Sequence, residues 1–311
     1  MTDPDSNNPA IADVASLVGM RFGTRDLNFF PRLMARAALM GSHQSRSRGR
    51  GMDFEEVRQY QPGDDIRTID WRVTARTLTP HTKLFREERE RPVLIISDLR
   101  PGMFFGSRAL KSVLACQVSA ALGWAGLNAN DRVGGLLVGA QELAEIRPKR
   151  SHHTVLQLIH KLRDFSELLL HGQSSRFSMA DILKDCRRVA LPGSTLFLVS
   201  DFQDLDRDCE QHLFELARHC DITLCHIYDP LEKSLPPPAL YQVSDGEQRF
   251  VLNSRDGKLR QRFEQQFREH QGKLQRLANQ LRMGLLTFNT AEPVLPVLQQ
   301  AYSRKQKRHR R

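Results

Sequence analysis

Two apolar runs that each end in an aspartate constrain the fold of this chain more than any other feature. Residues 92–98 read Pro-Val-Leu-Ile-Ile-Ser-Asp, and residues 195–201 read Thr-Leu-Phe-Leu-Val-Ser-Asp. An unbroken apolar run of this length is typical of a strand that is buried on both faces. Such strands occur in parallel sheets covered by helices on both sides, so the two runs predict an α/β fold.

Strand and helix patterns alternate around these two runs. Further strands are predicted at 131–139, 222–228 and 285–289, with an antiparallel edge strand at 142–147 and a hairpin at 241–252. Helices are predicted at 108–127, 152–170, 179–189, 207–219 and 258–281. The alternation predicts right-handed crossovers and a doubly wound, Rossmann-like, mostly parallel six-stranded sheet with helices on both faces.

The predicted topology gives the two aspartates a common location. In a doubly wound sheet with strand order 3-2-1-4-5-6, the first and fourth strands are neighbours. Ligands bind in the crevice at the carboxyl ends of these strands. Asp98 and Asp201 end the two strands, so we expect their carboxylates side by side in the crevice.

The rest of the chain divides by composition. We expect a partly disordered helical segment at 1–40, an Arg/Asp-rich block at 41–90 packed on the main domain, the main domain at 91–290, and a basic tail at 291–311. The start of the chain lacks the pattern of a signal peptide, and no apolar stretch has the length of a membrane span. The five cysteines are scattered, which fits a reducing compartment. These features predict a cytoplasmic protein, with a location peripheral to the inner membrane left open.

Positive charge is concentrated near the ends. The formal net charge is +10, and basic residues cluster at 46–50 and 304–311. Such runs are usually solvated, and the alternative is contact with nucleic acid or an anionic membrane surface. No basic stripe interleaved with aromatic residues follows the chain, which disfavours nucleic acid as the partner.

The main domain resembles the von Willebrand factor A domain. The metal-ion-dependent adhesion site of that family uses an Asp-x-Ser-x-Ser motif, a threonine and a second aspartate. Asp98 and Asp201 match the two aspartates, whereas Arg100 and Gly102 replace both serines, and Ser178 is the stand-in for the threonine.

Three interpretations of the two aspartates follow. Asp98, Ser178 and Asp201 could hold Mg²⁺ or another divalent cation through their oxygens. Arg100 could instead bridge both acids as a fixed cation. In the third interpretation the acids cap the segments that follow, and no cofactor is bound.

The block upstream of the main domain carries a second resemblance. The segments Arg50-Gly-Met-Asp-Phe54, Arg58-Gln-Tyr-Gln-Pro-Gly-Asp-Asp-Ile-Arg67 and Asp70-Trp71 resemble the bacterial "domain of unknown function 58" family. The resemblance implies a von Willebrand factor A-like protein that works with a MoxR-type AAA+ ATPase. On its own residues, the Pro-Gly pair predicts a turn, and Asp64 or Asp65 is expected to cap a helix at 66–75.

This block has two interpretations. It is either a salt-bridge network that docks on the main domain or a recognition surface for a partner, because exposed Arg, Tyr and Trp favour binding. The recognition surface would consist of Arg58, Tyr60, Asp64, Asp65, Arg67, Asp70, Trp71 and Arg76, together with Arg100 of the main domain.

Catalytic motifs are absent from the sequence. It has no phosphate-binding P-loop, no Gly-x-Ser-x-Gly elbow and no His-Glu-x-x-His, and Gly134-Gly135 lies inside a predicted strand. The sequence therefore predicts a non-catalytic adaptor that acts with the ATPase on an unknown protein client. A metal-dependent phosphoester hydrolase at Asp98 and Asp201 and a binder of nucleic acid or anionic membrane through the basic ends are the alternatives.

Overall fold

The computed structural model describes residues 8–27, 52–61, 64, 66–87, 92–244 and 249–302. These residues form two compact units. The main unit contains residues 8–27 and 92–302, and the smaller unit contains residues between 52 and 87. The basic residues at 46–50 and 304–311 lie outside the described residues.

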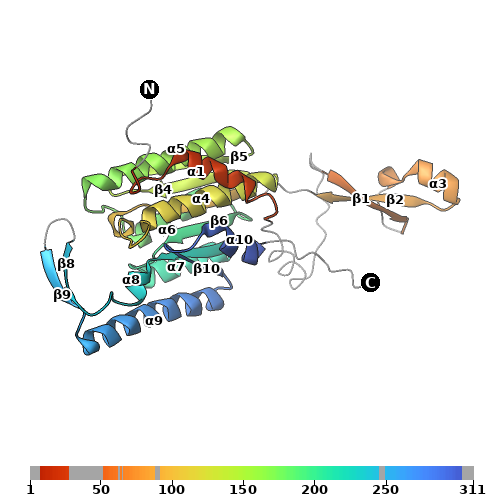
Figure 1. The fold of residues 1–311 in the computed structure, drawn as a ribbon. Helices are drawn as coiled ribbons and strands as arrows, with labels where there is room; N and C mark the ends of the chain where they lie inside the picture. Colours follow the sequence, from red (N-terminus) through yellow and green to blue (C-terminus); the bar gives the residue numbers. More distant parts are fainter. Residues whose placement is uncertain are drawn as a thin grey trace, which may run out of the picture. The chain divides into compact units, whose positions relative to one another are not determined.

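A six-stranded sheet forms the centre of the main unit (Figure 1). Its strands lie in the order β10-β7-β6-β3-β4-β5, and only β5 runs antiparallel to its neighbour. Their bounds are β3 Pro92–Asp98, β4 Arg132–Val138, β5 Leu143–Lys149, β6 Thr195–Ser200, β7 Asp221–Tyr228 and β10 Gly284–Asn289. This order confirms the predicted doubly wound topology, and β5 is the predicted antiparallel edge strand.

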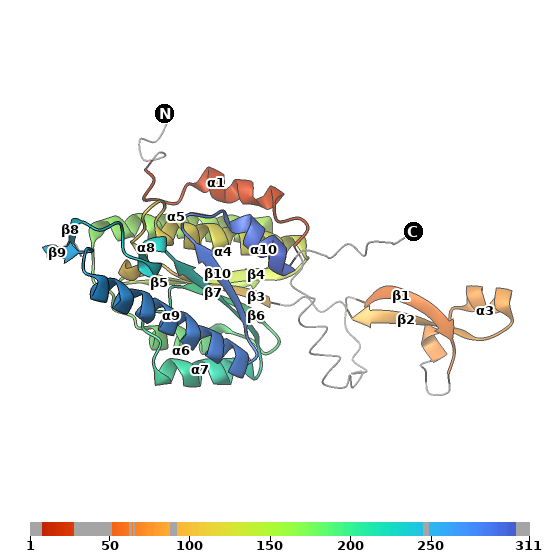
Figure 2. The same cartoon turned by 60° about the horizontal axis from the view of Figure 1, so that its bottom comes forward.

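Helices cover both faces of the sheet (Figure 2). One face carries α1 Val14–Gly19, α4 Lys111–Asn128, α5 His152–Leu168 and α10 Val294–Tyr302, and the other carries α6 Met179–Val189, α7 Arg207–Ala217 and α9 Gly257–Gln280. Each layer of helices closes its own apolar core against the sheet. Because β3 is buried along its whole length, it belongs to both cores, as its unbroken apolar sequence predicts.

Both ends of the described chain belong to the main unit, and the helix expected near the start is α1. Helix α10 lies within the predicted basic tail, and its Val294, Leu298 and Tyr302 are buried in the core. Pro293 and Pro296 argue against a helix here, because proline disrupts the interior of a helix. Proline is nevertheless tolerated just before a helix and in its first turn, which is where both residues lie. Near the other end, the Leu17 backbone oxygen accepts a hydrogen bond from the Trp124 indole at 3.1 Å. The first described residues therefore belong to the main unit.

The smaller unit is built on a β-hairpin that the polar sequence did not reveal. β1 Met52–Gln59 pairs antiparallel with β2 His81–Glu87, and the chain between them forms the short 3₁₀ helix η2 Ile66–Thr68 and helix α3 Trp71–Thr77. The predicted helix at 66–75 is therefore interrupted. Its cap is Asp70, whose carboxylate accepts from the backbone N–H groups of Arg72 and Val73.

Two further features match the expectations. The predicted hairpin at 241–252 consists of β8 Leu240–Ser244 and β9 Arg249–Asn253. A side-chain carbon at Gly134 would lie 2.5 Å from the backbone oxygen of Ile146, so this glycine permits close strand packing.

Among the helices of the described residues, none has the length and apolar character needed to cross a membrane.

Candidate functional site

Asp98 and Asp201 meet at the carboxyl ends of β3 and β6. The two strands are parallel neighbours, with Ser97 opposite Val199. Both carboxylates are buried, and the Ser200 hydroxyl donates to Asp98 Oδ2 at 2.7 Å. The expectation that the strands bring these acids to one site is thus confirmed.

Arg100 neutralises the first of the two acids. Its guanidinium donates to both oxygens of Asp98 at 2.9 and 2.8 Å and to both oxygens of Asp204 at 2.7 and 2.9 Å. The remaining N–H donates to the Phe177 backbone oxygen at 3.1 Å, so all five guanidinium donors are used. Burial acts to lower the Arg100 pKa, but the hydrogen bonds and charges of Asp204 and Asp98 outweigh it and raise the pKa.

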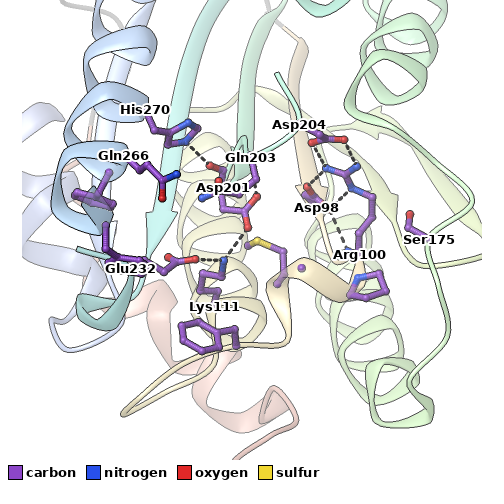
Figure 3. Close-up of a pocket in the computed structure, with 16 residues that line it drawn as sticks. Asp98, Arg100, Lys111, Ser175, Asp201, Gln203, Asp204, Glu232, Gln266 and His270 are labelled. Carbon is purple, nitrogen blue, oxygen red and sulfur yellow. Dashed lines mark hydrogen bonds and ion pairs between the residues drawn. The ribbon is translucent and has the colours of Figure 1, made fainter. Parts of the chain in front are cut away.

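Lys111 neutralises the second acid. This first residue of α4 has a side chain only 2% exposed, and its ammonium lies 2.7 Å from Asp201 Oδ2 and 2.7 Å from Glu232 Oε1. Burial acts to lower the Lys111 pKa, and the charges of Asp201 and Glu232 outweigh it, so that the pKa is raised. Burial raises the pKa of Asp201 while the ammonium opposes that rise. Figure 3 shows the two ion-pair networks side by side.

This geometry separates the three interpretations of the site. Arg100 does act as a fixed cation, but it bridges Asp98 to Asp204, whereas the bridge to Asp201 was predicted wrongly. The capping interpretation also holds in part, because Asp98 accepts from the Arg100 backbone N–H and Asp201 accepts from that of Gln203.

The donor set does not fit a divalent cation. Arg100 and Lys111 already occupy both oxygens of Asp98 and one oxygen of Asp201. The Ser178 hydroxyl, proposed as a third ligand, instead forms a capping box with Asp181 at the start of α6. Within the described residues, no group of three or more acidic, histidine or cysteine side chains is arranged to hold a metal.

A third strand also ends in an aspartate at this edge of the sheet. Asp229 follows β7 and is completely buried. Its Oδ2 accepts from the backbone and hydroxyl of Ser107 at 2.7 and 2.9 Å and from the Thr290 hydroxyl. Asp229 thereby ties the loop between β3 and α4 to the segment after β10.

The loop and α9 form the walls of a hollow above the charges. Its volume is about 590 Å³, and its apolar lining consists of Met103 and Phe105 from the loop and Phe263 and Phe267 from α9. The lining also includes Asp98, Arg100, Lys111, Asp201, Asp204 and Glu232. We call this hollow the crevice. It combines a buried ionic floor with aromatic walls, the usual composition of a binding pocket.

A buried histidine lies behind the aromatic wall. His226 is 1% exposed, its ring stacks on Tyr228 at 5.8 Å, and it contacts His270 at 5.5 Å. His226 Nε2 has no hydrogen-bond partner among the described residues. Burial lowers the pKa of His226 to about 3, and the charges of His270 and Lys111 add to this effect.

The smaller unit contains the other predicted interaction residues. Arg58 pairs with Asp64 at 2.8 Å, and Asp64 also accepts from the Gln61 backbone rather than capping a helix. Trp71 is 68% exposed on α3. Arg67 and Arg76 are exposed, Tyr60 is half-buried, and Asp65 lies outside the described residues.

Sequence reasoning missed four residues of the site and its support: Lys111, Asp204, Asp229 and Glu232. The sequence contained signals for Asp229 and Glu232. Asp229 ends a predicted strand just as Asp98 and Asp201 do, and Asp229-Pro-Leu-Glu232 is a capping box. Lys111 had no such signal, because a lysine at the start of a helix is usually solvated.

The sequence is similar to those of several known proteins. The model of the family described as "Protein of unknown function DUF58" matches residues 56–273. Uncharacterized protein Rv1480 of Mycobacterium tuberculosis is 27% identical over 257 residues, covering 81% of this chain and 79% of the relative. The Mycobacterium bovis protein Mb1516 gives the same values.

Part of the chain is also similar to solved structures. The conserved hypothetical protein BatB from Bacteroides thetaiotaomicron has a TM-score of 0.45 at 12% identity, covering 68% of this chain and 96% of that structure. The SpRpn10 VWA domain has a TM-score of 0.36 at 12% identity, covering 68% and 94%. The order and directions of the six strands give the main unit a von Willebrand factor A-like fold.

The Lys111 network predicts the effect of removing its cation. Lys111→Met removes the cation that the buried Asp201 shares with Glu232, so we expect the free energy of unfolding to fall by about 3–5 kcal/mol. Adding Asp201→Asn should restore part of this loss, and Lys184→Met at an exposed position should change little. Denaturant unfolding measures all four proteins. Equal losses for Lys111→Met and Lys184→Met would contradict the buried pairing.

The low pKa of His226 predicts an acid-dependent loss of stability. Between its unfolded pKa near 6.5 and its folded pKa of about 3, the unfolded chain binds the proton and the folded chain does not. The stability that neutral His226 contributes is therefore fully present above pH 6.5. As the pH falls below 6.5, the free energy of unfolding decreases by about 1.4 kcal/mol per pH unit. Denaturant unfolding from pH 7 to 4 should give a shallower slope for His226→Phe, whereas exposed His153→Phe should match the parent. Parallel slopes would refute the assignment.

Proposed function

Since this chain belongs to the family described as protein of unknown function DUF58, we propose that it is a non-catalytic interaction module that works with a MoxR-type AAA+ ATPase. In this proposal it assists the assembly or maturation of a client protein complex. The crevice is its main contact surface, and it binds without a metal ion. The observation that carries the proposal is a ligand-sized hollow whose buried carboxylates are already paired with the side chains of Arg100 and Lys111.

The crevice has the properties of a binding surface. Phe105 is 43% exposed at its edge although it is a large aromatic residue, and Phe104 beside it is 38% exposed. Aromatic side chains supply much of the binding energy of protein interfaces when a partner covers them. The buried ion pairs beneath them fix the walls, so a partner meets a preformed surface.

The chemistry of the crevice supports binding over catalysis. Metal-assisted hydrolysis needs carboxylates that are free to hold the ion and a water molecule. Asp98 and Asp204 share the guanidinium of Arg100, and Asp201 and Glu232 share the ammonium of Lys111. These pairs leave the described crevice without a carboxylate set poised for metal binding or general base action.

The smaller unit offers a second contact surface. Trp71 and Ile66 are 68% and 65% exposed, and Arg72 and Arg76 are exposed on the same short helix as Trp71. Exposed Trp and Arg are frequent hot-spot residues. The choice of a MoxR-type ATPase as the partner comes from the resemblance of this block to its family.

Binding of the purified chain to the MoxR-type ATPase of the same genome tests the proposal. We expect Phe105→Ala to weaken binding at least about tenfold, because a buried aromatic contact at an interface is worth more than ~1.4 kcal/mol. Phe214→Ala is the matched control, since Phe214 is 54% exposed on α7 and lies outside the crevice. Biolayer interferometry with the ATP-bound ATPase provides the affinities.

The two parts of the proposal fail in different ways. No binding by the parent chain would reject the ATPase as the partner. If Phe105→Ala leaves the affinity for the ATPase unchanged, the crevice is rejected as the contact surface. If only Trp71→Ala weakens binding, the contact surface lies on the smaller unit.

A further inference from the structure

We infer that the crevice receives a basic side chain, lysine or arginine, from a partner protein. This inference rests on the proposed interaction function and specifies the chemistry of the partner. The inference depends on which charged groups of the crevice are accessible to an incoming side chain.

The crevice carries excess negative charge. Four carboxylates line it, those of Asp98, Asp201, Asp204 and Glu232, against the two cations Arg100 and Lys111. Even a protonated Asp201 would leave the acids in excess. An incoming cation is therefore attracted and an incoming carboxylate is repelled.

The cations of the crevice are less accessible than its rim carboxylates, since the Arg100 side chain is 11% exposed. Arg100 uses all five of its N–H donors on Asp98, Asp204 and the Phe177 backbone oxygen. Lys111 is 2% exposed and holds two carboxylates. By contrast, the side chains of Asp204 and Glu232 are 41% and 19% exposed, so the accessible charge at the rim is negative.

The walls complement the stem of a long basic side chain. Met103, Phe105, Phe263 and Phe267 line the hollow above these acids. Lysine and arginine bury their methylene stems against apolar surface while the charged end stays polar, and aromatic faces attract the cation. The volume of about 590 Å³ lies within the usual range of ligand pockets, about 300–1,000 Å³.

Methionine-methyl NMR of the full-length chain tests this inference with defined peptides. The probes are acetyl-Gly-Gly-X-Gly-Gly-amide peptides in which X is arginine, lysine, citrulline or glutamate. The Met103 methyl, assigned with Met103→Leu, reports on the crevice. We expect saturable shifts with arginine and lysine, binding at least about fivefold weaker with the uncharged isostere citrulline, and the weakest response with glutamate.

Substitutions of the rim carboxylates provide a second test of the inference. Asp204→Asn and Glu232→Gln each remove an accessible charge, so we expect the arginine peptide to bind about threefold to tenfold more weakly. Glu269→Gln is the matched control, because Glu269 is exposed on α9 but lies outside the crevice lining. Thermal unfolding of each variant confirms that it is folded before titration.

Three results would overturn the inference: equal affinity for arginine and citrulline, preference for glutamate, or no Met103 shift with any probe. None of them would reject the interaction function by itself, because the effect of Phe105→Ala on ATPase binding is measured independently. Loss of the ATPase interaction together with intact arginine binding would instead reject the proposed partner and retain the basic side chain as the ligand chemistry.

Discussion

The buried ion pairs at the carboxyl ends of β3 and β6 are the interaction on which the rest of the site depends. The sheet brings Asp98 and Asp201 together, and two carboxylates removed from water need compensation. Arg100 and Lys111 provide it from inside the chain. Each cation also pairs with a second acid, Asp204 or Glu232, so that four segments of the chain together form the floor of the crevice.

The surroundings of the floor support it in the same way. Asp229, which follows β7, accepts hydrogen bonds from Ser107 and Thr290 and thus connects the loop carrying Phe105 to the segment after β10. His270 Nε2 lies 3.0 Å from the backbone oxygen of Asp201 and anchors α9 over the crevice. A surface shaped by polar anchors beneath aromatic walls is suited to recognising a partner.

Sequence patterns predicted the fold more completely than the site. Strands buried on both faces have a distinctive composition, so the sheet order and the neighbouring positions of Asp98 and Asp201 followed from them. The pairing of Arg100 with Asp204 and the burial of Lys111 depend on how loops and helix starts converge, which spacing does not encode. The hairpin of the smaller unit was hidden because its strands are rich in charged residues.

The replacement of a metal by internal cations is tested most directly by isothermal titration of Mg²⁺, Mn²⁺ and Ca²⁺ into chelator-treated protein. Our account predicts no saturable binding by the native chain. It predicts gained binding by Arg100→Ser/Gly102→Ser/Lys111→Ala, since a side chain at Gly102 would begin 3.8 Å from Asp201 Oδ2. Saturable binding to the native chain that Asp201→Ala abolishes would contradict the account.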